Sequence, residues 1–194
     1  MYSLILDSAT KILYVALVKD NKDILFEKYI EGKNDHAKNI VKVVDDALKS
    51  ANITVNDLNE AVVGIGPGSY TGVRMAVTVC KMLAVFKTNI KLYKISTLKL
   101  IASGNKGIVL ASIDARRGNS FGAIIDIKNN KYIVDEALIS TELLKQNKYD
   151  YISNEESYKV DPIYVLSNKE IVDNPHLLVP NYLRDTEAER NFNA

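Results

Sequence analysis

The sequence predicts an α/β fold in which a group of antiparallel strands is followed by parallel strands with helical connections. Three observations predict it. The chain opens with closely spaced apolar strand patterns, continues with alternating helix and strand patterns, and contains a glycine-rich turn between a strand and a long apolar helix. This alternation is typical of a mixed sheet that helices cover.

The start of the chain predicts three strands. Apolar residues dominate the segments 3–7, 12–18 and 24–30, and turns that contain Asp, Asn, Lys and Ser separate them. Because these turns are short enough for hairpins, we expect the strands to form an antiparallel meander.

Helices and strands alternate in the middle of the chain. After a polar turn at 32–35, the apolar positions have the three-four spacing of an amphipathic helix; they are Ala37, Ile40, Val41, Val44, Leu48 and Ala51. The next predicted elements are a strand at 61–65, a helix at about 71–87, a strand at 91–95 and a helix that begins at Ser96 or Thr97. The resulting order, βββαβαβα, is that of a ribonuclease-H-like domain, which actin-like ATPases share.

A second, reduced domain is expected after the first. The patterns weaken into strands near 108–114 and 121–127, a further short strand, and short helical pieces around a polar stretch at 145–160. We therefore expect an N-terminal domain at 1–103 and a reduced second domain at 104–194.

The composition is that of an ordinary globular protein, with 47% hydrophobic and 25% charged residues in 194 positions. The formal net charge of +1 argues against strong nonspecific binding to nucleic acid, so any RNA contact should be weak or shared. We expect a cytoplasmic chain, because no apolar leader or membrane-spanning run is present. Cys80 is the single cysteine, inside an apolar helix, which favours a buried structural thiol.

A glycine-rich segment, VGIGPGSYTGVR at 63–74, leads from a strand into the apolar helix. Helix starts of this kind can bind anions through unpaired backbone N–H groups. The segment nevertheless lacks both the dinucleotide fingerprint and the Gly-Lys-Ser or Gly-Lys-Thr of a phosphate loop. The alternative is a turn in which Ser69 or Thr71 caps the helix. Arg74 opposes the helix dipole, so its guanidinium should meet an outside partner such as a carboxylate or phosphate.

The helix at 71–87 has two apolar faces. At about 100° per residue, one face suffices to cover the sheet; it consists of Val73, Ala76, Val77, Cys80, Leu83 and Ala84. The opposite side, where a surface helix would carry charge, is lined by Met75, Val79, Met82 and Phe86. We expect another polypeptide to cover this side. The alternative is that the C-terminal segment folds back over it.

Polar residues after the first strand could belong to an anion site. Asp7 ends this strand, where an actin-like ATPase would hold a carboxylate near metal-bound phosphate, and Ser8 and Thr10 supply hydroxyl groups. Ser69 of the glycine-rich segment is a further candidate. The alternative is an Asx or Ser turn that caps a hairpin.

Two arginines follow a strand of the second domain. Arg116 and Arg117 could hold an anion, or they could form a structural ion pair with Asp114. No metal is expected, because His36 and His176 lie in neither an HxxxH nor an HExxH pattern. The glycine-rich segment is not GxSxG, so Ser69 is not expected to act as a hydrolase nucleophile.

Five features of the sequence together carry a family resemblance. They are LILDSAT at 4–10, His36 at the start of the first helix, GPGSYTGVR at 66–74, DARRG at 114–118 and PNYLR at 180–184. In this order and across nearly the whole chain, they resemble the bacterial TsaB (YeaZ) family. Members of this family are the noncatalytic partners of TsaD, the enzyme that makes threonylcarbamoyladenosine in tRNA. His36 is followed by Ala-Lys where the family usually has Ser-Glu.

The resemblance implies an actin-like (ASKHA) fold of two ribonuclease-H-like halves, the second of them reduced. It implies no catalytic residues, no metal and no cofactor on this chain alone, with ATP or ADP bound only within an assembled complex. The helices near 35–51 and 71–87 would form a bundle with TsaD or, in its absence, with a second copy of the chain.

The resemblance also implies a place in a larger assembly. The chain would activate transfer of a threonylcarbamoyl group, delivered as an adenylate made by another enzyme, to adenosine 37 of tRNAs that read ANN codons. It would work with the ATPase TsaE and would meet tRNA only through the complex, without a membrane. The expected interface residues are Met75, Val79, Met82, Phe86, Arg74, Ile40 and Val44.

Two other functions remain as alternatives. A stand-alone actin-like kinase of a small metabolite is favoured by Asp7 and disfavoured by a length that leaves little room for a complete second domain. A metallopeptidase is disfavoured by the lack of paired histidines.

Overall fold

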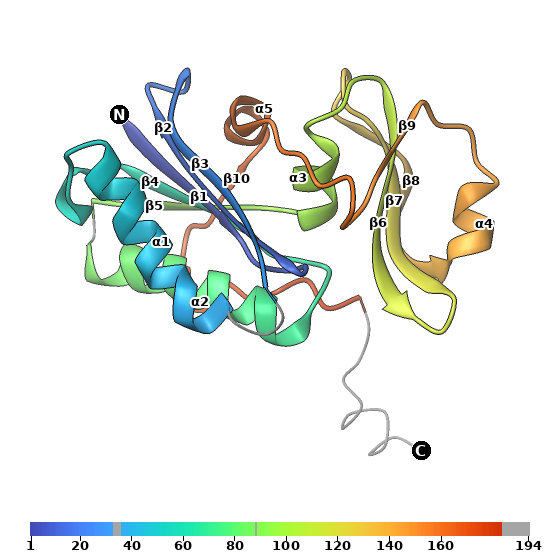
Figure 1. Cartoon of the computed structure of the whole chain (residues 1–194), viewed down its shortest axis with the longest axis horizontal. Coiled ribbons are helices and arrows are strands. Elements are labelled where there is room, and N and C mark those ends of the chain that lie inside the picture. Colours follow the sequence, from blue (N-terminus) through green and yellow to red (C-terminus); the bar gives the residue numbers. More distant parts are fainter. Residues whose placement is uncertain (33–35, 88, 184–194) are drawn as a thin grey trace, which may run out of the picture.

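The computed structural model describes residues 1–32, 36–87 and 89–183, in which two sheets lie next to each other (Figure 1). Most of the polar turn expected at 32–35, and Arg184 of the PNYLR motif, lie outside the described residues.

The first sheet has six strands in the order β10-β5-β4-β1-β2-β3. They are β1 (Tyr2–Asp7), β2 (Ile12–Lys19), β3 (Asp23–Glu31), β4 (Glu60–Gly64), β5 (Lys91–Ile95) and β10 (Glu170–Ile171). β1, β2 and β3 form the expected antiparallel meander. β4 runs parallel to β1 and to β5, as helical crossovers require. The predicted order of the first domain is therefore confirmed.

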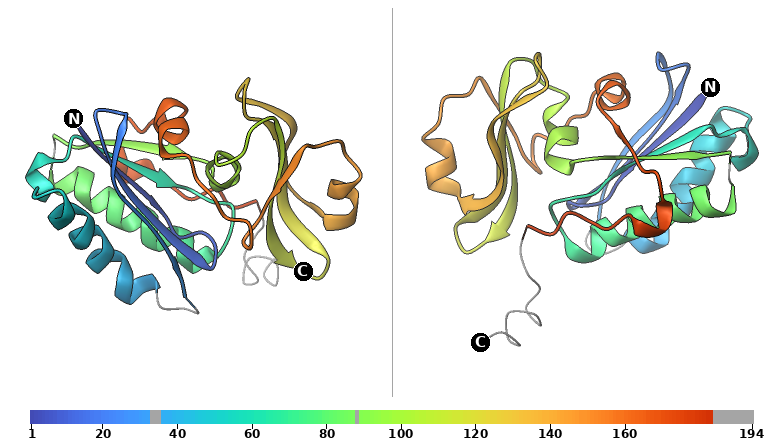
Figure 2. Two further views of the ribbon diagram at one scale, coloured as in Figure 1. Left: turned by 45° about the horizontal axis from the view of Figure 1, so that its top comes forward. Right: turned by 180° about the vertical axis from the view of Figure 1, so that it is seen from behind.

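The helices of this domain follow the predicted pattern closely. They are α1 (His36–Ser50), the short 3₁₀-helix η1 (Val55–Asp57), α2 (Tyr70–Phe86) and α3 (Thr97–Ala102). α1 and α2 lie side by side on one face of the sheet, and α3 lies on the other face, toward the second sheet (Figures 1 and 2). Ser96 caps α3 by accepting a hydrogen bond from the Lys99 N–H.

The second sheet repeats the strand order of the first in shorter form. Its strands are β6 (Ile108–Arg116), β7 (Asn119–Asp126), β8 (Lys131–Ser140) and β9 (Tyr151–Ser153), in the order β8-β7-β6-β9. β6, β7 and β8 are antiparallel, and β9 runs parallel to β6, as β4 does to β1. The strand expected to be short, β8, has ten residues. The other helical turns among residues 104–183 are α4 (Thr141–Lys145), α5 (Pro162–Ser167) and η2 (Pro175–Leu177).

The predicted second domain, 104–194, does not end in the second sheet. β10 pairs with β5, so the chain returns to the first sheet. The Lys81 ammonium then donates to the carbonyl oxygens of His176 and Leu178, each at 3.1 Å. We call residues 172–183 the C-terminal strap. Its short, irregular elements carry no periodicity from which this return could be predicted.

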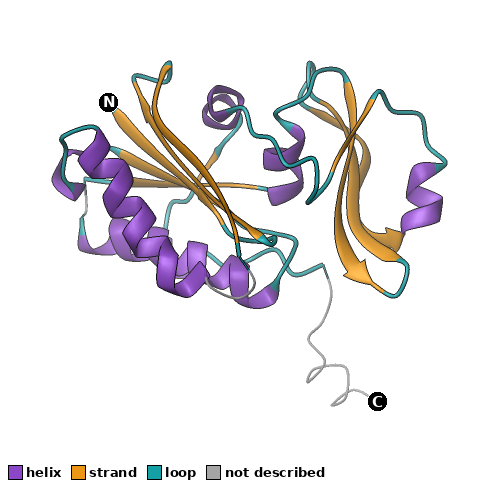
Figure 3. Ribbon diagram, in the orientation of Figure 1, coloured by secondary structure: helices purple, strands orange, loops and turns teal. Residues whose placement is uncertain are grey.

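Residues of β1 alternate between two cores. Leu4 and Leu6 pack with α1 and α2 on one face, whereas Ile5 packs with α3, α5 and the second sheet on the other. Burial on both faces explains the uninterrupted apolar run of this strand. The outer face of the second sheet has only a small core, which Leu144 of α4 covers (Figure 3). In its described part, the second domain is thus reduced mainly in its helices.

Candidate functional site

The glycine-rich segment is packed tightly against the residues that follow β1. A Cβ on Gly64 would lie 1.8 Å from Oδ2 of Asp7, and a Cβ on Gly72 would lie 2.1 Å from the Ser8 carbonyl oxygen. Ser8 donates its hydroxyl to the Gly72 carbonyl at 2.7 Å, and the Ser69 N–H donates to the Ala9 carbonyl at 2.6 Å. These two positions accept only glycine, because any side chain there would displace a neighbouring segment.

Ser69 caps α2, since its hydroxyl accepts a hydrogen bond from the Gly72 N–H at 3.3 Å. Of the two residues predicted as caps, the structure selects Ser69. The cap uses the hydroxyl that an anion would otherwise have contacted.

Asp7 is completely buried, and its carboxylate accepts hydrogen bonds from distant parts of the chain. Oδ2 accepts from the Thr97 hydroxyl at 2.6 Å. Oδ1 accepts from the Ala9 N–H at 3.0 Å and from the Tyr158 hydroxyl at 3.4 Å. The bond to Ala9 is the Asx turn that the alternative prediction describes. Thr97 connects this site to the glycine-rich segment, because its Oγ1 accepts from the Gly66 N–H at 3.0 Å.

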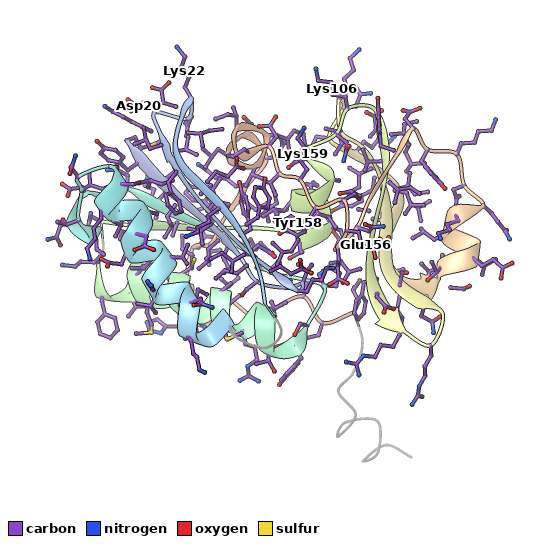
Figure 4. The ribbon with its side chains drawn as sticks, viewed as in Figure 1. Asp20, Lys22, Lys106, Glu156, Tyr158 and Lys159 are labelled. Carbon is purple, nitrogen blue, oxygen red and sulfur yellow. The ribbon has the colours of Figure 1, made fainter. Side chains whose placement is uncertain are left out.

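Tyr158, which Figure 4 labels, comes from the segment after β9 and places its hydroxyl beside the Asp7 carboxylate. Its ring lies 6.4 Å from that of Tyr14 and 5.9 Å from that of Tyr29, in an aromatic cluster. Burial, and then the negative charge of Asp7, holds the pKa of Tyr158 well above its usual value. The phenol is therefore a protonated hydrogen-bond donor to Asp7.

Arg116 ends β6 and Arg117 begins the turn of the β6–β7 hairpin, with φ angles of 66° and 55°. The Asp114 carboxylate accepts a hydrogen bond from the Arg116 backbone N–H at 2.8 Å. Within the described residues, no ion pair joins Asp114 to either arginine, so the structure does not support the predicted pairing. Both arginines are exposed on the second domain.

An open groove of about 480 Å³ runs between α1 and α2. It is lined by Ile40, Val41, Tyr70, Thr71, Arg74, Met75, Thr78 and Val79. Large apolar side chains of the same two helices remain in solvent: the exposed fraction is 65% for Val41, which lines the groove, 52% for Met82 and 76% for Phe86. An apolar surface shared by two adjacent helices is typical of a protein-binding face. We call α1, α2 and their groove the helical face.

Arg74 lies at one end of the helical face and has a partner within its own helix. Its guanidinium donates to the Tyr70 hydroxyl and lies 5.1 Å from the centre of the Tyr70 ring. Tyr70, four residues earlier, thus supplies this guanidinium with both an oxygen and a π face. That Arg74 also meets an outside partner stays a prediction. Tyr70 in turn stacks on Tyr182, with ring centres 5.2 Å apart.

The chain is similar to known proteins over most of its length. A family model described as "TsaD: tRNA N6-adenosine threonylcarbamoyltransferase" matches residues 29–167. The TsaB of Bacillus subtilis, a tRNA threonylcarbamoyladenosine biosynthesis protein, is 28% identical over 99% of this chain and 98% of its own length. The TsaB of Escherichia coli is 34% identical over 63% of this chain and 54% of its own length. The chain belongs to the TsaB (YeaZ) family.

A solved structure supports the same fold. YeaZ from Pseudomonas aeruginosa matches with a TM-score of 0.77 and 20% identity, over 94% of this chain and 99% of that one. The prediction of an actin-like fold is therefore confirmed.

For this TsaB-family chain, the structure separates the predicted interface residues into two groups. Met82 and Phe86 are exposed, and Met75 and Val79 are half-buried at the groove. Ile40 and Val44 are buried in the core under α1, although Ile40 also lines the groove. Val41 is one exposed residue of the helical face that the sequence interpretation missed. The apolar stripe of α1 is wider than its contact with the sheet, so spacing alone could not separate inner from outer positions.

The C-terminal strap covers only one flank of α2. It contacts Lys81 and Tyr70, while Met82 and Phe86 stay exposed. The alternative in which this segment covers the second apolar side therefore does not hold for the described part of the strap.

Three further findings concern the described residues alone. No group of three or more His, Cys, Asp and Glu side chains there could hold a metal ion. No helix among them has the length and apolar character needed to cross a membrane. Cys80 is buried, and this burial raises its pKa to about 12. His36 begins α1, but its side chain lies outside what is described.

Proposed function

We propose that this TsaB-family chain is a noncatalytic subunit in threonylcarbamoyladenosine biosynthesis. In this proposal it pairs with a TsaD-type catalytic subunit through the helical face. The pairing holds the catalytic subunit in an active arrangement for transfer of the threonylcarbamoyl group to adenosine 37 of tRNAs that read ANN codons. The names of the TsaB relatives support the process, and the helical face supports the mode of action.

The exposed apolar surface of α1 and α2 is the observation that carries the proposal. Val41 and Phe86 lie on different helices and are each more than half exposed, with the groove between those helices. Ridges of two further helices could pack into such a surface and complete a four-helix arrangement. Removing these side chains from water would stabilise the complex in proportion to the apolar area buried.

The surroundings of Asp7 support a subunit without its own catalytic centre. Its carboxylate is occupied by Thr97, Tyr158 and the Ala9 N–H. A kinase needs the corresponding carboxylate to face metal-bound phosphate. Here the Asp7 carboxylate meets the hydroxyl groups of Thr97 and Tyr158 instead, and this disfavours the stand-alone kinase.

Other partners follow from the same assignment. Without TsaD, the same face would pair two copies of the chain into a homodimer, because the apolar surface would still be exposed to water. A TsaE-type ATPase and tRNA would join only the assembled complex, and ATP or ADP would be bound there.

Reconstitution tests the proposal directly. Purified TsaD, TsaE and the adenylate-forming enzyme would be incubated with tRNA, with and without this chain, and threonylcarbamoyladenosine would be measured by mass spectrometry. We expect product only when the chain is present. Equal product in both reactions would contradict the assignment.

Substitution of an exposed methionine tests the surface. Met82→Arg should abolish binding to TsaD and self-association, because it places a charge in an apolar interface. Leu143→Arg is the matched control, since Leu143 is also apolar, helical and 55% exposed, but lies on α4 of the second domain. Binding measured by light scattering and calorimetry should be lost only in the first variant. If both variants bound equally well or equally poorly, the helical face would be excluded as the binding surface.

A further inference from the structure

The C-terminal strap joins the glycine-rich segment in a specific way. Leu178 is buried in the core under α2, and the Asn181 N–H donates to the Ile65 carbonyl at 2.7 Å. The Asn181 carbonyl oxygen lies only 3.2 Å from the place of a Cβ on Gly66. The strap thus follows the backbone of the segment that leads into α2 (Figure 2).

The side chain of Asn181 reaches the second domain. Its amide nitrogen donates to Oε2 of Glu136 on β8 at 3.0 Å. The other oxygen of Glu136 accepts from the Tyr132 hydroxyl at 2.5 Å, and the Lys99 ammonium lies 4.9 Å from the centre of the Tyr132 ring. Asn181 therefore connects β8 to the glycine-rich segment. Both Asn181 and Glu136 are partly buried, which limits competition from water.

The next residue continues the connection to the helical face. Tyr182 stacks on Tyr70, which is the first residue of α2 and a residue that lines the groove. Tyr70 accepts the hydrogen bond of Arg74, which also lines it. A continuous series of contacts thus runs from β8 to the groove, although every lining residue belongs to the first domain.

We propose that residues 180–182 act as a clasp through which the second domain positions the partner-binding groove. Asn181 holds β8 against the glycine-rich segment, and Tyr182 holds the first turn of α2. The inference rests on the proposed function for the identity of the partner. It assigns a task to the PNYLR motif and to the reduced second domain. A role limited to stability would affect unfolding but would leave the affinity of the groove unchanged.

A pair of substitutions at the interdomain hydrogen bond tests the clasp. Asn181→Asp places two carboxylates against each other and removes the donor. Adding Glu136→Gln restores both hydrogen bonds and reverses the direction of one, because the new amide nitrogen donates to the carboxylate introduced at position 181 while its oxygen still accepts from Tyr132. Glu136→Gln alone is the control, since Asn181 can rotate its amide to accept the hydrogen bond.

Two measurements are made on each full-length variant: amide hydrogen exchange in the free chain and affinity for TsaD by calorimetry. For Asn181→Asp we expect faster exchange in both 131–140 and 65–74, and binding weakened by about 10-fold. The double variant should return both the exchange rates and the affinity for TsaD to those of the unaltered chain. Faster exchange limited to 180–182, or unchanged affinity despite faster exchange in both segments, would overturn the clasp.

The same experiment separates this inference from the proposed function. If the unaltered chain does not bind TsaD, the proposed function fails. The clasp is then judged on exchange in the free chain: coupled changes in 131–140 and 65–74 that the double variant reverses support it, and an isolated change overturns it.

Discussion

A buried ion pair anchors the start of the C-terminal return, and its removal should destabilise the protein strongly. The Lys169 ammonium contacts Oε1 of Glu60, with exposed side-chain fractions of 11% and 5%. Ser3 donates its hydroxyl to the same oxygen at 2.6 Å, and the Lys169 ammonium lies 4.5 Å from the centre of the Tyr93 ring. The pair thus joins the segment before β10 to β4 and, through Ser3, to β1.

Lys169→Met would leave the Glu60 carboxylate buried without its cation. Breaking a buried pair in this way costs roughly 3–5 kcal/mol, because the remaining charge has lost its hydration and its partner. Native domains have unfolding free energies of roughly 5–15 kcal/mol, so the variant should be only marginally stable. Replacing both partners, as in Glu60→Gln with Lys169→Met, should recover part of the loss because no charge stays buried.

A neighbouring pair provides the control. Lys94 Nζ lies 3.5 Å from Oε2 of Glu170, and the exposed side-chain fractions are 36% and 69%. Because this pair is exposed, Lys94→Met should lower the free energy of unfolding by at most about 1 kcal/mol. Urea unfolding followed by circular dichroism gives the free energies, provided that the slope with urea is unchanged. Equal losses in the two variants, or no recovery in the double variant, would refute the reasoning from burial.

Three further predictions concern other parts of the molecule. Gly64→Ala should lower the urea midpoint far more than Gly118→Ala, because the new Cβ at position 64 would overlap Asp7. At Gly118 there is open space, and only the φ of +75° costs an alanine roughly 1–2 kcal/mol. Equal midpoints for the two variants would contradict this. Cys80, with its pKa near 12, should resist iodoacetamide in the native chain at about pH 8 and react after unfolding, as intact mass would show. Since the pKa of Tyr158 is raised, its contribution to stability is complete below about pH 10 and is lost above it. Tyr158→Phe should therefore show a smaller decrease in urea midpoint between about pH 9 and pH 11 than the unaltered chain, and an identical decrease would argue against it.

The elements of the first domain could be predicted because their signals are local. β1 reads as one apolar run, and this agrees with burial on both faces. The end of β5 at Ile95 and the cap of α3 at Ser96 follow from neighbouring residues alone. The helical period of α2 likewise separated its core side from the side that carries Met82.

The contacts of Asp7 could not be predicted in the same way. Thr97 and Tyr158, which bind its carboxylate, are 90 and 151 positions away in the sequence. The residues next to Asp7 in the sequence do not show whether its carboxylate faces a bound phosphate or accepts hydrogen bonds from its own chain. The sequence also did not indicate that Arg74 would bind Tyr70 within its own helix.

The sequence by itself determined the order of strands and helices, the glycine-rich connection into α2 and the family, because propensity, periodicity and motif spacing act over short distances along the chain. The tertiary structure alone decided which polar groups satisfy one another and which apolar side chains stay in solvent. Tyr158 enters the space beside Asp7, Asn181 joins two domains, and Val41 rather than Val44 faces water. These outcomes depend on how distant segments pack, since burial and hydrogen bonding are set by neighbours in space.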